Sequence, residues 1–271
     1  MTQRIEACFA KAAADGRKLL IPYVTAGDPS LDVTLALMHQ MVTDGADIIE
    51  LGVPFSDPMA DGPVIQAACE RALHAGTTLS SILELVERFR QSNADTPIVL
   101  MGYMNPVEIM GHEAFAQRAS AAGVDGVLIV DLPPEEGGEL LDLLKAHGLD
   151  TIFLLSPNTP EYRVKKVCDL VSGYVYYVSL KGVTGAATLD TAEVAERVAA
   201  IKSLSSVPVA VGFGIRDAES AKAVGSVADA VVVGSAFVTL VGEHGADQAS
   251  ILSTVGGLLA SMRQGLDSLK A

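Results

Sequence analysis

The chain has 271 residues, 49% of them apolar, and is long enough to bury a large core within one domain of residues 1–271. Its 19 Lys and Arg against 33 Asp and Glu give a formal net charge of −14. This charge disfavours a role in binding nucleic acid, because phosphate backbones recruit clustered cations. A small phosphorylated substrate stays compatible with it, since backbone N–H groups hold phosphate without a cation.

Cysteine spacing and the distribution of apolar residues indicate the compartment. Cys8, Cys69 and Cys168 lie far apart with no CxxC spacing, which is typical of reduced, buried thiols. Neither a charged-then-apolar leader nor a run of 18 apolar residues is present. We therefore expect a soluble cytoplasmic protein with no membrane association.

Short apolar runs rich in β-forming residues alternate along the chain with amphipathic segments, a pattern typical of a parallel sheet covered by helices. Eight strands are predicted, over residues 18–24, 47–51, 97–101, 126–130, 151–155, 173–178, 207–211 and 230–233. Helical periodicity fills the intervals, for example over 31–43, 78–91, 135–147 and 191–203. Two further helices are expected, over 4–14 before the first strand and over 249–269 at the end.

One turn recurs where helices lead into strands. Gly45, Gly123 and Gly148 each follow a predicted helix and stand two residues before an aspartate. Glycine after the last helical residue caps the helix and turns the chain sharply into the next strand. Its repetition favours a (β/α)8 TIM barrel with an extra N-terminal helix. An open doubly wound sheet is the alternative, although the first turn lacks the GxGxxG motif of a dinucleotide site.

Glu50 is the first candidate catalytic residue, because active sites of such barrels lie at the carboxyl ends of the strands. Strand alternation places Ile48 and Glu50 on one face and Ile49 and Leu51 on the other. The apolar Ile49 and Leu51 suit the outer face, against the helices, so Glu50 points into the barrel. Burial there would raise its pKa and keep a proton on it near neutral pH. The alternative is a structural carboxylate paired with a basic side chain.

The segment after this strand is a second candidate. Asp57 and Asp61 lie in a stretch rich in Pro and Gly that is too irregular for a helix or strand. A carboxylate on such a segment can reach the substrate by loop movement. From the residues alone, Asp61 fits equally well a catalytic role and a solvated loop position.

Glycine-rich segments follow the last three predicted strands. They include Gly182 and Gly185, then Gly212 and Gly214, and finally Gly234 with Ser235. Glycines let the backbone approach an anion closely, and a short helix starting after Gly234 would direct its N–H groups at that anion. This pattern predicts a phosphorylated substrate, which barrels of this kind commonly bind at the final two loops.

The sequence gives little support for a metal site or for catalysis by a nucleophilic side chain. The histidines fall in helical or surface segments without ligand spacing to acids or cysteines, so no metal site is expected. A GxSxG nucleophile motif is missing. Lys181 follows the sixth predicted strand and could form a Schiff base, although its glycine loop favours an exposed or anion-attracting role.

The motifs together resemble the tryptophan synthase α-subunit family over essentially the whole chain. Residues 22–29 (PYVTAGDP) and 50–63 (ELGVPFSDPMADGP) carry most of this resemblance, and the second segment is highly specific. It continues through 104–106 (MNP), 131–133 (DLP), 182–185 (GVTG) and 212–215 (GFGI). The family implies cleavage of indole-3-glycerol phosphate to indole and glyceraldehyde 3-phosphate, in tryptophan biosynthesis and without a cofactor of its own.

The resemblance also assigns site residues, by position in this sequence. The paired acids fall at Glu50 and Asp61. The remaining substrate contacts fall at Tyr23, Met101, Tyr176, Thr184, Gly185, Phe213, Gly214, Gly234 and Ser235, of which Tyr23, Met101 and Tyr176 form the indole pocket. Tyr23 departs from the Phe that the family often has there.

A partner is implied by the same resemblance. The family's α subunit docks onto a pyridoxal-phosphate-dependent β subunit in an α2β2 heterotetramer, and the contact residues fall at Pro54, Asp57 and Asn105. Three other functions compete with this assignment: a Schiff-base aldolase using Lys181, a catalytically silent phosphate-binding barrel, and a phosphosugar isomerase. The isomerase is disfavoured because no histidine stands at a predicted strand end.

Overall fold

Parallel strands alternate with helices along the whole described chain. The computed structural model describes residues 4–179, 191–212 and 214–270. Its strands are β1 (Leu19–Thr25), β2 (Ile49–Gly52), β3 (Ile98–Gly102), β4 (Gly126–Ile129), β5 (Asp150–Thr151), β6 (Phe153–Leu155), β7 (Val175–Val178), β8 (Val209–Gly212) and β9 (Ala230–Val233). The sheet order is β5-β4-β3-β2-β1-β9-β8-β7-β6. Because β1 pairs in parallel with both β2 and β9, the last strand returns to the first, as in a barrel.

The predicted strand over 151–155 is divided in two. β5 pairs with β4 and β6 with β7, so successive residues of one extended segment pair with different neighbours. Between them, the N–H of Ile152 donates to the carbonyl of Val127 at 3.0 Å. The segment therefore occupies the fifth position of the ring, and the predicted (β/α)8 barrel is confirmed.

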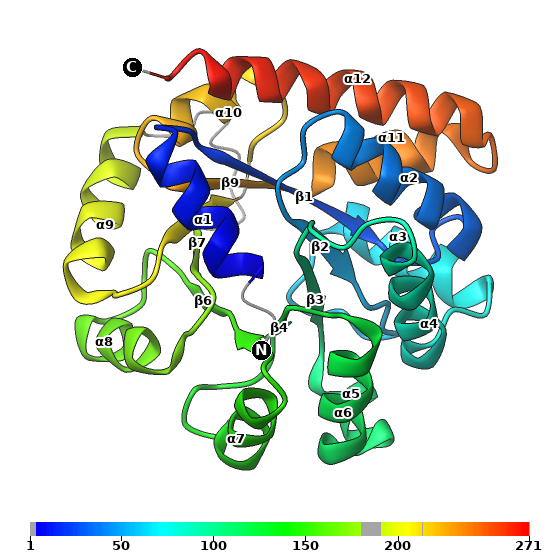
Figure 1. Ribbon diagram of the computed structural model, residues 1–271, viewed down its shortest axis with the longest axis horizontal. Helices are drawn as coiled ribbons and strands as arrows, with labels where there is room; N and C mark the ends of the chain where they lie inside the picture. Colours follow the sequence, from blue (N-terminus) through cyan, green and yellow to red (C-terminus); the bar gives the residue numbers. More distant parts are fainter. Residues whose placement is uncertain (1–3, 180–190, 213, 271) are drawn as a thin grey trace.

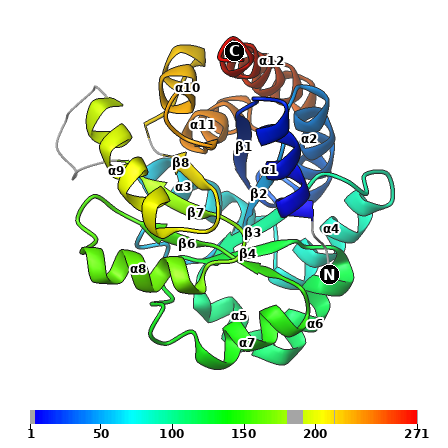
Figure 2. The same ribbon diagram turned by 60° about the vertical axis from the view of Figure 1, so that its left-hand side comes forward.

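Helices surround the strands in Figures 1 and 2, and α1 lies across the barrel. The helices of the described residues are α1 (Arg4–Ala14), α2 (Leu31–Thr43), α3 (Pro63–His74), α4 (Leu79–Arg90), α5 (Met104–Met110), α6 (His112–Ala122), α7 (Gly138–Ala146), α8 (Glu161–Leu170), α9 (Thr191–Leu204), α10 (Ala218–Gly225), α11 (Ser235–His244) and α12 (Gln248–Asp267). The predicted elements match these bounds to within three residues. No described helix has both the length and the apolar composition needed to cross a membrane.

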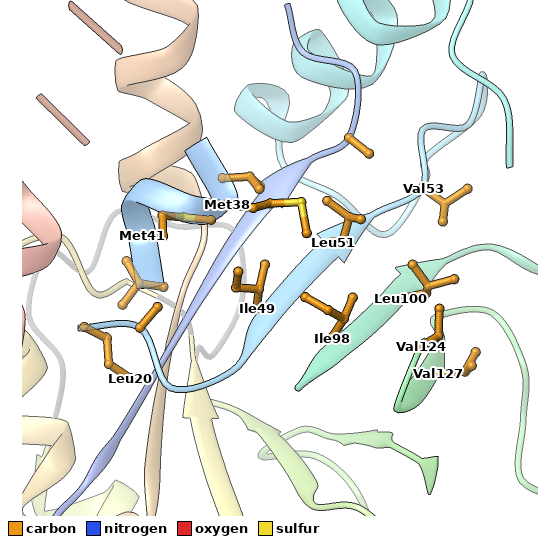
Figure 3. Close-up of a cluster of buried hydrophobic side chains, with 14 of the residues drawn as sticks. Leu20, Met38, Met41, Ile49, Leu51, Val53, Ile98, Leu100, Val124 and Val127 are labelled. Carbon is orange, nitrogen blue, oxygen red and sulfur yellow. The ribbon is translucent and has the colours of Figure 1, made fainter. Parts of the chain in front are cut away.

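Two apolar layers hold the barrel together. The outer layer lies between strands and helices, where Ile49 and Leu51 of β2 lie near Met38 and Met41 of α2 (Figure 3). The inner layer includes Ile48 and fills the barrel between the strands. Strand alternation had predicted this division on β2, and it leaves Glu50 on the inner face.

Helix α1 closes the amino end of the barrel, as the extra N-terminal helix of the prediction. Its buried residues Ile5, Phe9 and Ala12 belong to the inner apolar layer. The ring of Phe9 lies 5.8 Å from that of Tyr174 on the inner side. The carboxyl ends of the strands are therefore the open end at which a substrate can enter.

Aspartates at three junctions between a helix and the next strand hydrogen-bond to a neighbouring strand at the amino end of the barrel. Gly45 and Gly123 have positive φ angles of 108° and 91°, as the turn prediction requires. Asp47, Asp125 and Asp229 each accept, through one carboxylate oxygen, the N–H of a residue on the preceding strand. The donors, at 2.8 to 2.9 Å, are Leu20, Ile98 and Val209.

Candidate active site

Glu50 lies on β2 inside the barrel, and its side chain is fully buried. The hydroxyl of Tyr174 donates to Oε1 of Glu50 at 2.5 Å. Oε2 has no hydrogen-bond partner within the described part of the chain. Burial raises the pKa of Glu50 to about 7, and the Tyr174 hydrogen bond opposes that rise. Glu50 can therefore both hold and release a proton near neutral pH.

Tyr174 is a residue that the sequence analysis did not identify. It lies one residue before β7 and shares the inner face with Tyr176, two residues further on. Active-site residues of such barrels are expected at the carboxyl ends of strands, whereas Tyr174 reaches Glu50 from the amino end of its strand. Period-2 alternation with Tyr176 was the signal that could have placed it inside.

Asp61 lies in the irregular segment between β2 and α3, as predicted, and is partly buried. The hydroxyl of Tyr103 donates to its Oδ2 at 2.8 Å. Burial raises the pKa of Asp61, and the hydrogen bond from Tyr103 lowers it. Tyr103 was also missed by the sequence analysis, although it directly follows β3 at the end of the barrel where active sites form.

Tyr23 and Tyr176 lie inside the barrel, close enough to Glu50 and Asp61 for the charges of both acids to act on them. Burial raises the pKa of the Tyr23 and Tyr176 hydroxyls, and the charges of Glu50 and Asp61 add to the rise at each. Met101 packs against the apolar groups that contain the two tyrosines. The structure thus brings together the three residues of the expected indole pocket with the two acids.

The described residues that are expected to contact phosphate follow β8 and β9. Ser235 is the first residue of α11 and Gly234 is its N-cap, so the free N–H groups of the first helical turn lie at the carboxyl end of β9. Gly214 follows β8 with a φ of 73°. A Cβ built on Gly234 would lie 3.5 Å from Cδ1 of Tyr23. Helix α11 therefore presents a positive end next to the predicted indole pocket.

Several predicted residues lie outside the described part of the chain. Thr184, Gly185 and Phe213 are among them, and so is Lys181 of the alternative aldolase. All five histidines are described, and each lies within a helix or at its C-terminal cap: His39, His74, His112, His147 and His244. Without a histidine at a strand end, the site does not supply the electrophile expected of the phosphosugar isomerase.

The residues of this chain that are expected to contact a partner differ in solvent exposure. Asp57 and Asn105 are exposed, whereas Pro54 is buried. Near them, Met59 is 83% exposed and Ile109 is 82% exposed, which is unusual for large apolar side chains. These four exposed residues define what we call the rim surface, since they lie on the segments that follow β2 and β3.

The fold and site define a (β/α)8-barrel enzyme with two carboxylic acids and with the N-terminus of α11 at the carboxyl end of its strands. Comparison with known proteins specifies the family, because the profile described as "Tryptophan synthase alpha chain" matches residues 9–266. A tryptophan synthase alpha chain from Thioalkalivibrio sulfidiphilus is 61% identical to this chain, covering 97% of it and 99% of the relative. One from Laribacter hongkongensis is 59% identical, covering 98% and 99%. The chain belongs to the tryptophan synthase alpha chain family.

Solved structures agree with this assignment. The tryptophan synthase subunit alpha from Legionella pneumophila str. Paris is 43% identical and superimposes with a TM-score of 0.91, covering 98% of both chains. A chain from the tryptophan synthase complex of Pyrococcus furiosus is 38% identical with a TM-score of 0.81, covering 92% of this chain and 98% of its own. The family resemblance drawn from the motifs is confirmed.

Proposed function

We propose that Glu50 and Asp61 carry out the cleavage of indole-3-glycerol phosphate to indole and glyceraldehyde 3-phosphate, the reaction of the family's alpha chain. The observation that carries the proposal is the fully buried Glu50, with one oxygen unpartnered in the described structure and a pKa of about 7. Such a carboxyl group is suited to proton transfer in both directions at neutral pH.

Glu50 performs the two proton transfers. In its protonated form it donates to C3 of the indole ring as a general acid. The resulting carboxylate then takes the proton of the hydroxyl on the neighbouring side-chain carbon. The C–C bond breaks, its electron pair returns to the indole ring, and the hydroxyl carbon becomes the aldehyde. Glu50 ends in its initial protonated state, so no external acid or base is consumed.

Asp61 stabilises the intermediate between these transfers. Protonation at C3 places positive charge on the ring nitrogen, and an ionised carboxylate near its N–H lowers the energy of that state. The hydrogen bond that Asp61 accepts from Tyr103 favours the ionised form. Because the reaction involves only proton transfer and redox-neutral C–C cleavage, it proceeds without a metal or organic cofactor in this subunit.

Substrate binding divides between two parts of the site. Tyr23, Met101 and Tyr176 contact the indole ring, and the phosphate lies against Gly214, Gly234 and Ser235, with Thr184, Gly185 and Phe213 completing these contacts. The N-terminus of α11 supplies a positive potential of about half an elementary charge for the phosphate. Holding both ends of the substrate places the scissile bond between the two acids.

Indole release from indole-3-glycerol phosphate tests the catalytic proposal. We expect Glu50→Gln and Asp61→Asn each to reduce kcat by roughly 100-fold or more, because each removes a group needed in the transition state. Glu135→Gln, which changes an exposed acid paired with Arg163, should match the wild type. Near-wild-type cleavage by either active-site variant would contradict the assignment. Borohydride treatment with substrate should trap no adduct, whereas an aldolase using Lys181 would form one.

We also propose that this chain acts as a single cytoplasmic domain that docks onto a pyridoxal-phosphate-dependent β subunit in an α2β2 assembly. Related structures support a partner, since those from Pyrococcus furiosus and Mycobacterium tuberculosis contain tryptophan synthase as a complex or in aminoacrylate-bound form. Met59 and Ile109 on the rim surface expose apolar area beside Asp57 and Asn105. Docking there would exclude this area from water and contact the segment that carries Asp61.

A further inference from the structure

Tyr103 contacts the segment between β2 and α3 at three points. Its hydroxyl accepts the N–H of Ala60 at 3.1 Å and donates to Oδ2 of Asp61 at 2.8 Å. Its ring lies 5.4 Å from that of Phe55, with 31° between their planes. Tyr103 is only 3% exposed and is the N-cap of α5, directly after β3. A rigid position on the barrel thus contacts both ends of an irregular segment.

We propose that Tyr103 is the positioning residue that holds Asp61 at the site and keeps its Oδ2 in one orientation. The inference rests on the proposed function, because it assigns to Tyr103 an effect that is exerted through Asp61. It adds a third side chain to the two acids, one that does not itself touch the reacting atoms.

The hydroxyl group is the essential feature, because it acts as acceptor and donor at once. Accepting the N–H of Ala60 orients the oxygen, so its own proton is directed at the carboxylate of the next residue. Phenylalanine could keep the ring contact with Phe55 but would lose both hydrogen bonds. The bond to Asp61 has an ionised acceptor and is therefore among the stronger kinds in proteins.

The other backbone hydrogen bonds of the segment, which include two short turns within it, do not involve the carboxylate of Asp61. At its start, the N–H of Val53 donates to the carbonyl of Met101 at 2.8 Å. At its end, Nε2 of Gln66 donates to the carbonyl of Asp61 at 2.8 Å. That second bond fixes the backbone of Asp61 but leaves its side chain able to rotate. The Tyr103 hydroxyl thus restrains the carboxylate itself.

The electrostatic surroundings of Asp61 increase the importance of this bond. Its charge acts on Tyr23 of β1, Cys69 of α3 and Tyr176 of β7, all of which are neutral acids with pKa values raised by burial. Tyr103 is the group whose hydrogen bond lowers the pKa of Asp61 against the effect of burial. Removing it would leave the ionised form less stable and free to reorient.

A double-mutant cycle on indole release tests the proposal, using wild type, Tyr103→Phe, Asp61→Asn and the double variant. We expect Tyr103→Phe to lower kcat by about 10- to 100-fold with a smaller change in KM, and to have almost no further effect in the Asp61→Asn background. Tyr162→Phe, at a tyrosine on α8 that is 74% exposed, is the matched control and should match the wild type.

Hydrogen exchange provides a second measurement that does not depend on activity. In Tyr103→Phe, peptides covering residues 54–62 should exchange faster than in the wild type, while peptides from β1 and α12 should be unchanged. Wild-type turnover and wild-type exchange rates in Tyr103→Phe would overturn the proposal. It would also be overturned if Tyr103→Phe lowered kcat by the same factor in the wild type and in Asp61→Asn. An inactive wild type would instead refute the proposed function, and the exchange result would still decide whether Tyr103 holds the segment.

Discussion

At the scale of single residues, the most unusual feature is a fully buried Glu50 with an unpartnered oxygen. Burial disfavours the charged form, and no cation among the described residues contributes to its pKa. The Tyr174 hydroxyl satisfies one oxygen only. Glu50 is held there because β2 pairs with both β1 and β3, which fixes the face on which its side chain lies. The protein thus retains a destabilising group at the position where the proposed chemistry requires it.

The raised pKa of Glu50 makes stability depend on pH in a defined direction. Since its pKa rises from 4.5 to about 7 on folding, the folded protein keeps a proton that the unfolded chain releases between these values. The stability that this proton contributes to the folded state is fully present below pH 4.5 and is lost as the pH rises through 7. Relative to wild type, Glu50→Gln should therefore raise the free energy of unfolding at pH 8 by up to about 3 kcal/mol.

Urea unfolding of wild type and Glu50→Gln at pH 8 and pH 4.5 measures this effect. The difference between the two proteins should nearly vanish at pH 4.5, where the folded wild type carries a neutral Glu50. An equal difference at both pH values would show that ionisation of Glu50 is not its cause.

At the scale of elements, buried aspartates connect the amino ends of the strands to the surrounding helices. Asp125 is fully buried, and its carboxylate accepts from the guanidinium groups of Arg4 at 2.8 Å and Arg90 at 2.7 Å. It also accepts the N–H of Ile98 at 2.8 Å. These contacts join α1, α4 and β3, so one side chain fixes three elements around the amino end of the barrel.

Asp125→Ala should lower the free energy of unfolding by about 3 to 5 kcal/mol, because Arg90 would lose its charged partner in a largely buried position. Asp32→Ala is the control: it removes an ion pair of the same type, with Arg88 at 2.9 Å, but with both side chains exposed. This control substitution should lower the free energy of unfolding by less than about 1 kcal/mol. Similar urea midpoints for the two variants would contradict the structural role of Asp125.

At the scale of the whole molecule, the two ends of the barrel have separate roles. The amino end is closed by α1 and held by buried ion pairs, whereas the carboxyl end carries the two acids and the start of α11. The rim surface lies at this second end, since Met59 follows β2 and Ile109 lies on the helix that follows β3. The proposed catalytic site and the proposed docking surface thus share one end, where the hydroxyl of Tyr103 donates to Asp61.

Ile109→Asp should weaken binding to a cognate β subunit by at least about 10-fold, since it places a charge in an apolar contact. Isothermal titration calorimetry would measure the affinity for the β subunit, and indole release at a saturating concentration of the β subunit would measure activation. Leu204→Asp, at a 38% exposed leucine on α9 away from the rim surface, is the control and should bind normally. Unchanged affinity of Ile109→Asp would exclude this part of the rim surface from the interface.

The sequence alone determined the order of elements, the inward direction of Glu50 and the glycine caps. Each of these follows from local chemistry: strand alternation separates Glu50 from Ile49 and Leu51, and positive φ angles favour Gly45 and Gly123. Strand alternation and motif resemblance both indicated Glu50 as a catalytic acid, whereas the assignment of Asp61 depends mainly on the resemblance, and the chemical roles of both stay predictions.

Only the tertiary structure decided which side chains meet the two acids. Tyr174 reaches Glu50 across 124 positions of sequence, and Tyr103 reaches Asp61 across 42. No local pattern records such contacts, because they depend on the curvature and register of the closed barrel. For the same reason, the division of the fifth strand between β4 and β7 was not predictable from an apolar run that reads as a single strand.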